Sequence, residues 1–283
     1  MQVNVVDNHT TSVSEVLSSA IRDSNDVRMA VAFVSRSGYD LIADAIAQAL
    51  GAGGTVELLA GMDMQGTEPE ALETIYRLSR VNSNVSLYCY SALEPTAIYH
   101  PKLYLIRHED DVTAIVGSSN LTAGGLKKNT EINLALKGTL HDEVVADMYQ
   151  SYAYLKFHPK RVVPDEEFLS LYSQLVSTER RTRRVANNQS SIRGLRREFA
   201  TKANSLRRPQ RTPRDIVGGW LETVYDVLPD GQFTNADVYA HESLFRQRYP
   251  GNQTIKDKIR QQLQILARLG FVEHVGRGTW RKV

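Results

Sequence analysis

The chain has a single cysteine in 283 residues, so an intramolecular disulfide is excluded. Cys89 lies inside the apolar run VSLYCY, which predicts a buried and unreactive thiol. No apolar run approaches the roughly 18 residues that a membrane-spanning helix needs. The first residues, MQVNVVDNHTTSVSE, lack the basic flank and apolar core of a signal peptide. We therefore expect a cytoplasmic protein with no membrane partner.

Clusters of His, Cys, Asp and Glu at metal-ligand spacing are also missing, so we expect no metal and no other cofactor. The net charge of +2 says little about partners, but the charges are unevenly distributed. Between Glu179 and Asp215 there are twelve Lys or Arg residues and three acidic ones, a local charge of +9 that leaves −7 for the remainder. A basic segment of this kind is either a solvated linker or an attraction site for a polyanion.

Strands and helices alternate in the first half of the chain. This alternation predicts an α/β fold with a mostly parallel sheet, covered by helices and carrying functional residues at strand ends. A helix at 141–157 is expected to close this domain. The expected strands are 27–35, 56–60 and 85–90, and the expected helices are 38–50 and 68–80.

Polar residues stand at the ends of three further strand-like runs between Tyr99 and Leu136. These runs, 102–106, 112–116 and 131–136, are short and rich in β-branched or aromatic residues. Each polar residue taken alone has an ordinary interpretation, because a lone histidine or a Gly-Ser-Ser-Asn turn is common. Their combination at these spacings favours a functional site.

The residues in question have complementary chemistry. His100 and Lys102 are two apart, so strand alternation points both side chains to one face. An imidazole can act as a nucleophile or a general acid near neutral pH, and Glu131 is a candidate partner that fixes its tautomer. Lys102 supplies positive charge, and Ser118 and Asn120 supply neutral donors, for the oxygens of a phosphate. The set predicts phosphoryl transfer without a metal.

The pattern H-x-K, then G-S-x-N, then a Glu eleven residues past the Asn resembles the signature of the phospholipase D superfamily. The resemblance implies that His100 is a covalent nucleophile, that Lys102, Ser118 and Asn120 bind phosphate, and that Glu131 orients the imidazole. The superfamily pattern has an Asp five residues after the Lys, where this chain has Arg107. That departure resembles the nuclease branch and counts against a lipid-specific phospholipase.

The superfamily chemistry requires two histidines, and the chain carries one complete motif. His158, Pro159 and Lys160 repeat the H-P-K of the motif, but no Gly-Ser-x-Asn follows, so we interpret this repeat as a coincidence. A homodimer in which the two His100 side chains meet at a two-fold axis is the simplest way to supply both histidines.

A different pattern begins after the basic segment. Short helices, a long amphipathic helix at 254–269 and two strands turning at Gly276 to Gly278 resemble a winged helix-turn-helix domain, like the C-terminal modules of some restriction endonucleases. We expect a phospholipase D-like nuclease domain at 1–165, a basic helical linker at 166–212 and a winged-helix DNA-binding domain at 213–283. The resemblance implies base or phosphate contacts from Asn252, Gln253, Thr254, Lys256, Arg260 and the wing residue Arg277.

A phosphodiesterase site, a basic linker and a DNA-reading domain together predict a nuclease acting on double-stranded DNA. The expected enzyme is a metal-independent endonuclease of restriction or phage-defence type that works through a phosphohistidine. One alternative is a DNA-binding regulator, or a targeting subunit of a defence complex, whose phosphodiesterase site is vestigial. A phospholipase is a weaker alternative, because the sequence contains no amphipathic segment with an exposed apolar face.

Overall fold

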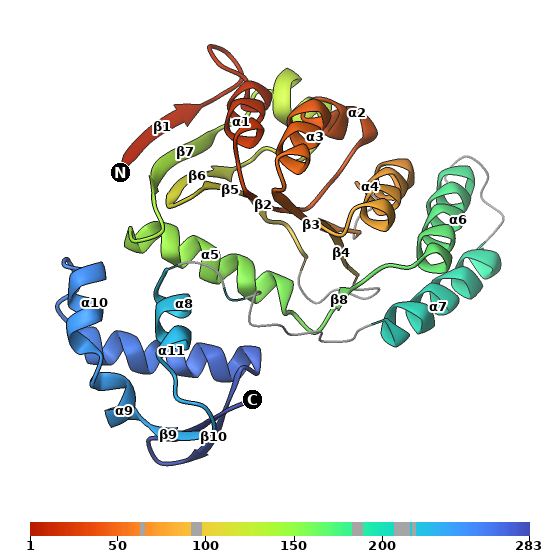
Figure 1. Ribbon diagram of the computed structural model, residues 1–283. Coiled ribbons are helices and arrows are strands. Elements are labelled where there is room, and N and C mark those ends of the chain that lie inside the picture. The colour runs from red at the N-terminus through yellow and green to blue at the C-terminus, as the bar shows by residue number, and fades with distance from the viewer. Residues whose placement is uncertain (63–65, 92–97, 183–188, 207–215, 217–218) are drawn as a thin grey trace. The chain divides into compact units, whose positions relative to one another are not determined.

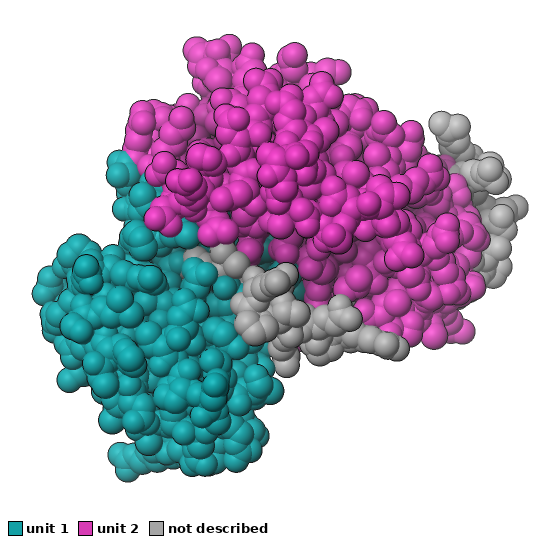
Figure 2. Space-filling model, in the orientation of Figure 1, with its two compact units in different colours: residues 1, 138–157, 209–283 teal, residues 2–137, 158–208 magenta. Residues whose placement is uncertain are grey.

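A computed structural model describes residues 1–62, 66–91, 98–182, 189–206, 216 and 219–283 (Figure 1). The chain forms two compact units, which Figure 2 shows in different colours. One unit contains residues 2–137 and 158–208, and we call it the sheet unit. The other contains residue 1 and residues 138–157 and 209–283, and we call it the C-terminal unit.

The sheet unit is built on an eight-stranded sheet with the order β1-β7-β6-β5-β2-β3-β4-β8. The predicted α/β class is confirmed. Parallel pairing joins β2 to β3 and β3 to β4, whereas β5 and β6, which carry the motif, pair antiparallel. The strands are β1 (Gln2–Val6), β2 (Asp26–Val31), β3 (Thr55–Gly61), β4 (Val85–Tyr90), β5 (Lys102–His108), β6 (Asp111–Gly117), β7 (Asn133–Thr139) and β8 (Arg161–Val162).

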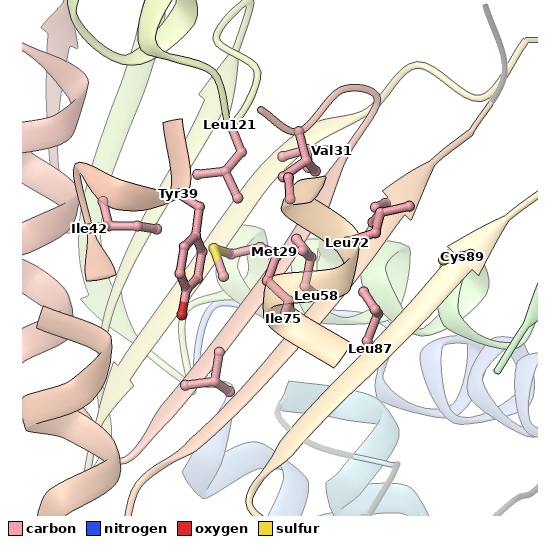
Figure 3. Packing of buried hydrophobic residues seen from close by; sticks show 14 of the residues in the cluster. Met29, Val31, Tyr39, Ile42, Leu58, Leu72, Ile75, Leu87, Cys89 and Leu121 are labelled. Atoms are coloured by element: carbon pink, nitrogen blue, oxygen red, sulfur yellow. The ribbon is translucent and has the colours of Figure 1, made fainter. Parts of the chain in front are cut away.

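Helices α1 to α4 pack their apolar sides with one face of the sheet in a single hydrophobic core, part of which Figure 3 shows. Ser12 begins α1 with a capping box to Glu15, which satisfies backbone donors at that helix end. The helix expected at 38–50 is two helices, because Ile42 adopts φ −120° and ψ 0° between them. The bounds are α1 (Val13–Arg22), α2 (Arg36–Asp40), α3 (Ala43–Gly51) and α4 (Pro69–Val81).

Cys89 belongs to this core and is fully buried, which confirms the expectation from its apolar surroundings. Burial raises the pKa of its thiol, so the thiol is neutral and unreactive at physiological pH. Among the described residues, no helix has the length and apolar character that crossing a membrane requires.

The predicted basic linker, 166–212, contains two helices that belong to the sheet unit. α6 (Glu166–Thr182) and α7 (Gln189–Ser205) pack together, and Phe168 of α6 stacks on Phe199 of α7 with ring centroids 4.8 Å apart. Both rings lie in the hydrophobic core of the sheet unit. This segment is therefore helical, as expected, but its apolar residues extend a folded core. Residues 183–188 and 207–212 of it lie outside the described part of the chain.

The C-terminal unit has the expected order of helices followed by a β-hairpin. β9, β11 and β10 form a three-stranded antiparallel sheet, and Gly270 ends the long helix α11 at φ 77°. This unit also takes up α5 (Glu143–Lys156), which the sequence assigned to the first domain. Its other elements are α8 (Gly219–Asp226), β9 (Gln232–Thr234), α9 (Asn235–Tyr239), α10 (Glu242–Arg248), α11 (Ile255–Leu269), β10 (Val272–Gly276) and β11 (Thr279–Lys282).

Candidate active site

The polar residues of the motif lie at one end of the neighbouring strands β5, β6 and β7 of the eight-stranded sheet. Leu103, near the start of β5, pairs with Val116, near the end of β6, so the segments that flank these two ends are neighbours. The backbone N–H of Ser118 donates to the carbonyl of Ile132 at 3.1 Å, which places the start of β7 beside them. The antiparallel arrangement therefore gathers residues that are more than thirty positions apart in the sequence.

His100 and Lys102 are in direct contact. The Lys102 Nζ lies 2.7 Å from Nδ1 and 3.0 Å from Nε2 of the His100 imidazole, and it donates to the His100 carbonyl at 3.2 Å. Although the residue is exposed, partial loss of hydration around the imidazole and, secondly, the charge of Lys102 lower the pKa of His100 below its usual value of 6.5. The imidazole is consequently neutral at physiological pH, which is the form that can attack phosphorus.

Lys102 is buried, with 8% of its surface exposed. Burial lowers the pKa of Lys102, and the nearby carboxylate of Glu131 opposes this by favouring the ammonium form. Ser118 Oγ donates to Glu131 Oε2, and the backbone N–H of Ile132 donates to Ser118 Oγ at 3.0 Å. The hydroxyl and the carboxylate are thereby fixed next to the ammonium group.

Asn120 is held by a residue outside the motif. The backbone N–H of Phe33 donates to Asn120 Oδ1 at 3.1 Å, which leaves the amide NH₂ as the group that can donate to a ligand. A side chain on Gly125 would lie 2.6 Å from the Asn120 carbonyl oxygen, so only glycine lets the following turn approach this backbone. Backbone groups of Phe33 and Gly125 therefore help to position the Asn120 side chain and its loop.

Two buried residues that sequence reasoning missed support the loop after β6. Tyr104 Oη donates to the Ser119 carbonyl at 2.9 Å, and Asn133 Oδ1 accepts the Ser119 backbone N–H at 3.1 Å. The sequence contained a signal for both, because each lies two residues beyond a motif residue, Tyr104 beyond Lys102 on β5 and Asn133, the first residue of β7, beyond Glu131. In each pair, Lys102 with Tyr104 and Glu131 with Asn133, the two residues are separated by one position.

The expected contact between Glu131 and His100 is not made within one chain. In the described part of the molecule, no hydrogen bond joins the Glu131 carboxylate to the imidazole; its partners are Ser118 and, at 3.4 Å, the side-chain amide of Asn129. The structure thus brings His100 to Lys102, and Ser118 to Glu131. The role of Glu131 in orienting an imidazole stays a prediction.

The arrangement suits a tetrahedral oxyanion with a nucleophile beside it. A neutral imidazole stands next to an ammonium group, a hydroxyl and an amide that can donate to non-bridging oxygens. Such a donor set can stabilise the negative charge that develops on those oxygens while a bond to phosphorus forms.

The candidate DNA contacts lie in the segment that leads into α11, on the first turns of α11, and on the turn between β10 and β11. Asn252 Oδ1 accepts the Thr254 backbone N–H at 2.8 Å, so this asparagine is used to start the helix. Gln253, Thr254 and Lys256 are exposed there, and Arg277 is exposed at the tip of the turn. The structure therefore places the predicted contacts at the helix start and the wing.

Lys256 and Arg260 of α11 are paired with carboxylates of the same unit. Lys256 Nζ lies 3.6 Å from Glu242 Oε2 of α10, and Arg246 Nη2 lies 2.6 Å from Glu242 Oε1. Arg260 forms an ion pair with Asp257. The pairs Glu242–Arg246 and Asp257–Arg260 lie within one helix at i,i+4 and i,i+3 spacing, which the sequence itself indicates. The pair of Lys256 with Glu242 joins two helices and depends on the angle between them.

His158 lies in the turn that precedes β8. Its Nδ1 accepts the Lys160 backbone N–H at 3.1 Å, and its ring lies 5.0 Å from that of Tyr90. The ring of Tyr90 also stacks on Tyr99, the residue before His100. His158 and Lys160 precede an edge strand of two residues and so lack the strand setting of the motif.

Two protein families match the chain, and the first match extends from the sheet unit into α5 of the C-terminal unit. A family described as "Cardiolipin synthase, PLD-like domain" matches residues 16–155, and a family described as "Dam-replacing HTH domain" matches residues 218–282. The predicted winged helix-turn-helix domain is thereby confirmed.

Among solved structures, the chain is similar to NucT from Helicobacter pylori, at 17% identity over 55% of this chain and 93% of that one, with a TM-score of 0.40. It is also similar to a phospholipase D family member, Nuc from Salmonella typhimurium, at 20% identity over 53% and 91% of the two chains, with a TM-score of 0.42. From the family matches, the chain carries a phospholipase D-like domain followed by a C-terminal Dam-replacing HTH domain.

Proposed function

We propose that the protein is an endonuclease of restriction or phage-defence type that cleaves double-stranded DNA in the cytoplasm, with a covalent phosphohistidine on His100 as intermediate. The observation that carries this proposal is the cluster of His100, Lys102, Ser118 and Asn120 at one end of neighbouring strands, in a chain that also holds an HTH domain. The cluster suits a phosphodiester, and the HTH domain suits DNA as its source.

In the proposed reaction the neutral imidazole of His100 attacks phosphorus and forms a P–N bond while the P–O bond to the leaving nucleoside breaks. A second histidine, present as an imidazolium, gives its proton to the leaving oxygen and becomes neutral. Water then attacks phosphorus, passes a proton to that second histidine, and breaks the P–N bond, which regenerates the neutral imidazole of His100 and the imidazolium of the second histidine. Lys102, Ser118 and Asn120 hold the non-bridging oxygens throughout.

The second histidine is proposed to be His100 of another copy, so that two chains share one catalytic centre. A dimer of this kind needs an apolar surface beside the site, and the sheet unit has one. Val5 pairs with Leu134 across β1 and β7, which places both on one face of the sheet. Leu134 and Ile132, two residues apart and next to Glu131, share that face.

This apolar surface is largely solvent-exposed, since 69% of Ile132 and 65% of Val5 are accessible. Val116, two residues before Ser118 on β6, extends it towards the site. Aliphatic side chains gathered on neighbouring strands are uncommon on the surface of a monomer. An isologous contact would bring two copies of this surface, and the sites beside it, together.

The double variant Ile132→Lys/Leu134→Lys tests the shared site. We expect it to sediment as a monomer and to lose cleavage while it retains DNA binding, because the HTH domain is unchanged. Val81→Lys is the matched control, since Val81 is an exposed aliphatic residue on α4, and it should change neither property. Wild-type protein that is monomeric and still cleaves DNA would refute the shared site. His158 would then be the next candidate for the second histidine.

The nuclease activity itself is tested by incubating the protein with methylated and unmethylated duplexes, in excess EDTA and in magnesium. Cleavage that survives EDTA is the expected result, because the proposed nucleophile is an imidazole rather than a metal-bound water. Mapping the ends would show any sequence or methylation dependence. Strict dependence on added magnesium would contradict the proposed role of His100.

His100→Ala separates the proposal from its main alternative. If the protein is a nuclease, this variant loses cleavage and keeps DNA binding. If it is a DNA-binding regulator with a vestigial site, the variant loses no activity that the wild type has.

A further inference from the structure

Phe33 lies beside His100 although it belongs to no part of the motif. The ring centroids of Phe33 and His100 are 5.7 Å apart at an interplanar angle of 75°, an edge arrangement that aromatic pairs favour. Phe33 follows the end of β2 and is partly exposed, while its neighbours Ala32 and Val34 are buried. Its ring therefore stands at the solvent-facing side of the site.

His100 has few other restraints. The residue precedes β5 and is exposed, and among the described residues the hydrogen-bond partner of its imidazole is Lys102. An imidazole attached to a non-strand segment would otherwise turn about its side-chain bonds. The Phe33 ring and the Lys102 ammonium thus flank the nucleophile and limit its orientations.

The backbone of Phe33 acts on a second group of the site. Its N–H fixes Asn120 Oδ1, and its carbonyl accepts the Leu121 backbone N–H at 3.1 Å. Val34 continues this pairing as a parallel bridge to Leu121. One residue therefore connects the histidine before β5 to the asparagine after β6.

Gly66 makes room for the Phe33 ring. A Cβ built on Gly66 would lie 2.1 Å from Cδ1 and 2.4 Å from Cε1 of Phe33, far inside contact distance. Thr67, the next residue, anchors this segment because its hydroxyl donates to the Gly61 carbonyl at 2.5 Å and accepts the Val34 N–H at 3.2 Å. The place of the ring thus depends on a glycine at position 66.

We propose that Phe33 is a positioning residue of the active site, whose ring orients the His100 imidazole and whose backbone orients the Asn120 amide. This proposal rests on the proposed function of His100 as the nucleophile. It adds a residue that contacts no reacting atom but sets the direction of the attacking nitrogen, on which the rate of an in-line displacement depends strongly.

The test compares Phe33→Ala, Phe33→Leu and Phe33→Tyr in cleavage of one duplex. We expect Ala and Leu to lower kcat by about 10- to 100-fold with KM for the duplex unchanged, because orientation is lost and binding is not. Tyr keeps the aromatic ring and should restore kcat to within about threefold of the wild type. Thermal melting identifies any variant that fails to fold, and Phe33→Tyr and Gly66→Ala keep the proposal testable in that case.

A double-variant cycle shows whether the effect passes through the ring. Gly66→Ala displaces Phe33 and should lower kcat in the wild-type background, but it should add nothing in the Phe33→Ala background. Gly51→Ala is the control, since a Cβ there meets nothing within 4 Å, and it should leave kcat unchanged.

Three outcomes would overturn the positioning role: unchanged kcat in Phe33→Ala, a raised KM with unchanged kcat, or equal effects of Gly66→Ala in both backgrounds. A raised KM would mean that the ring contacts DNA. Failure of the proposed function looks different, because His100→Ala would then retain cleavage whatever the Phe33 variants do.

Discussion

The candidate active site and the side of α11 that is predicted to face DNA both gather cations and polar groups, but they hold them in different ways. In the active site, Lys102 is buried and is bonded to both the ring and the carbonyl of His100. On α11, Lys256 and Arg260 are more than half exposed and lie against carboxylates of the same unit.

This difference predicts how each region responds to substitution. Buried groups with fixed partners in a low-dielectric setting contribute strongly and are sensitive to small changes in geometry. Exposed ion pairs contribute little each and are screened by salt. Substitutions in the active site should therefore change kcat by orders of magnitude, and substitutions on α11 should change DNA affinity by small, salt-dependent factors.

The largest effect is expected for His100→Ala, which removes the nucleophile. Cleavage should fall by about 10⁴-fold or more, while DNA affinity, measured by gel shift, should stay within about twofold. His108→Ala, at the exposed far end of β5, is the matched control and should behave as wild type. Comparable losses in the two variants would show that cleavage does not depend on the site described above.

Lys102→Gln should lower kcat by about 100-fold and also change the pH dependence of cleavage. Protonated imidazole cannot attack, so activity falls as the pH drops through the pKa of His100, which partial loss of hydration and Lys102 hold below 6.5. Loss of the ammonium charge should move that fall upwards, towards pH 6.5. A pH–rate profile of the residual activity checks this, and an acid limb that stays in place would contradict the coupling.

Lys256→Gln/Arg260→Gln should weaken DNA binding by about tenfold at moderate salt and leave kcat unchanged at saturating DNA. The slope of log affinity against log salt should become smaller by about 1 to 2, because fewer counterions are released. Arg268→Gln, in the last turn of the same helix, is the control. An equal loss in that variant would assign the effect to net charge rather than to the start of α11.

The smallest effect is expected for Glu242→Gln, which frees Lys256 and Arg246 from their shared carboxylate. DNA affinity should rise by about two- to fivefold, with a steeper salt dependence. Glu73→Gln, which breaks an exposed ion pair with Arg77 on α4, should have no effect on binding. Weaker binding in Glu242→Gln would mean that the carboxylate positions Lys256 for DNA instead of competing with it.

Much of the fold followed from local sequence signals. The α/β class, the hairpin after α11 and the strand character of the motif runs were predicted from alternation, apolar periodicity and glycine placement. The interpretation of 166–212 as a basic helical linker gave more weight to its charge than to the helical spacing of Phe168, Leu171 and Leu175, which are buried on α6. Its apolar stripe was a better guide than its net charge.

The spacing of the motif located His100, Lys102, Ser118, Asn120 and Glu131, but not the residues that hold them. Phe33 reaches the site because β2 lies beside β5, and a pairing between strands so far apart in the sequence leaves no local signal. The ion pair between Glu242 and Lys256 likewise depends on how α10 meets α11. Local patterns predicted which residues carry the chemistry. The long-range packing that orients these residues could be seen only in the structure.

In the proposed reaction, a nitrogen of His100 becomes covalently bonded to phosphorus. The most direct measurement is to mix the protein with a labelled duplex in EDTA, quench under alkaline conditions that preserve phosphohistidine, and identify the modified peptide by mass spectrometry. We expect a nucleotide adduct on His100 that is lost on acid treatment and absent in His100→Ala. Efficient cleavage with no adduct on His100 at any time point, or an adduct on a different residue, would contradict it.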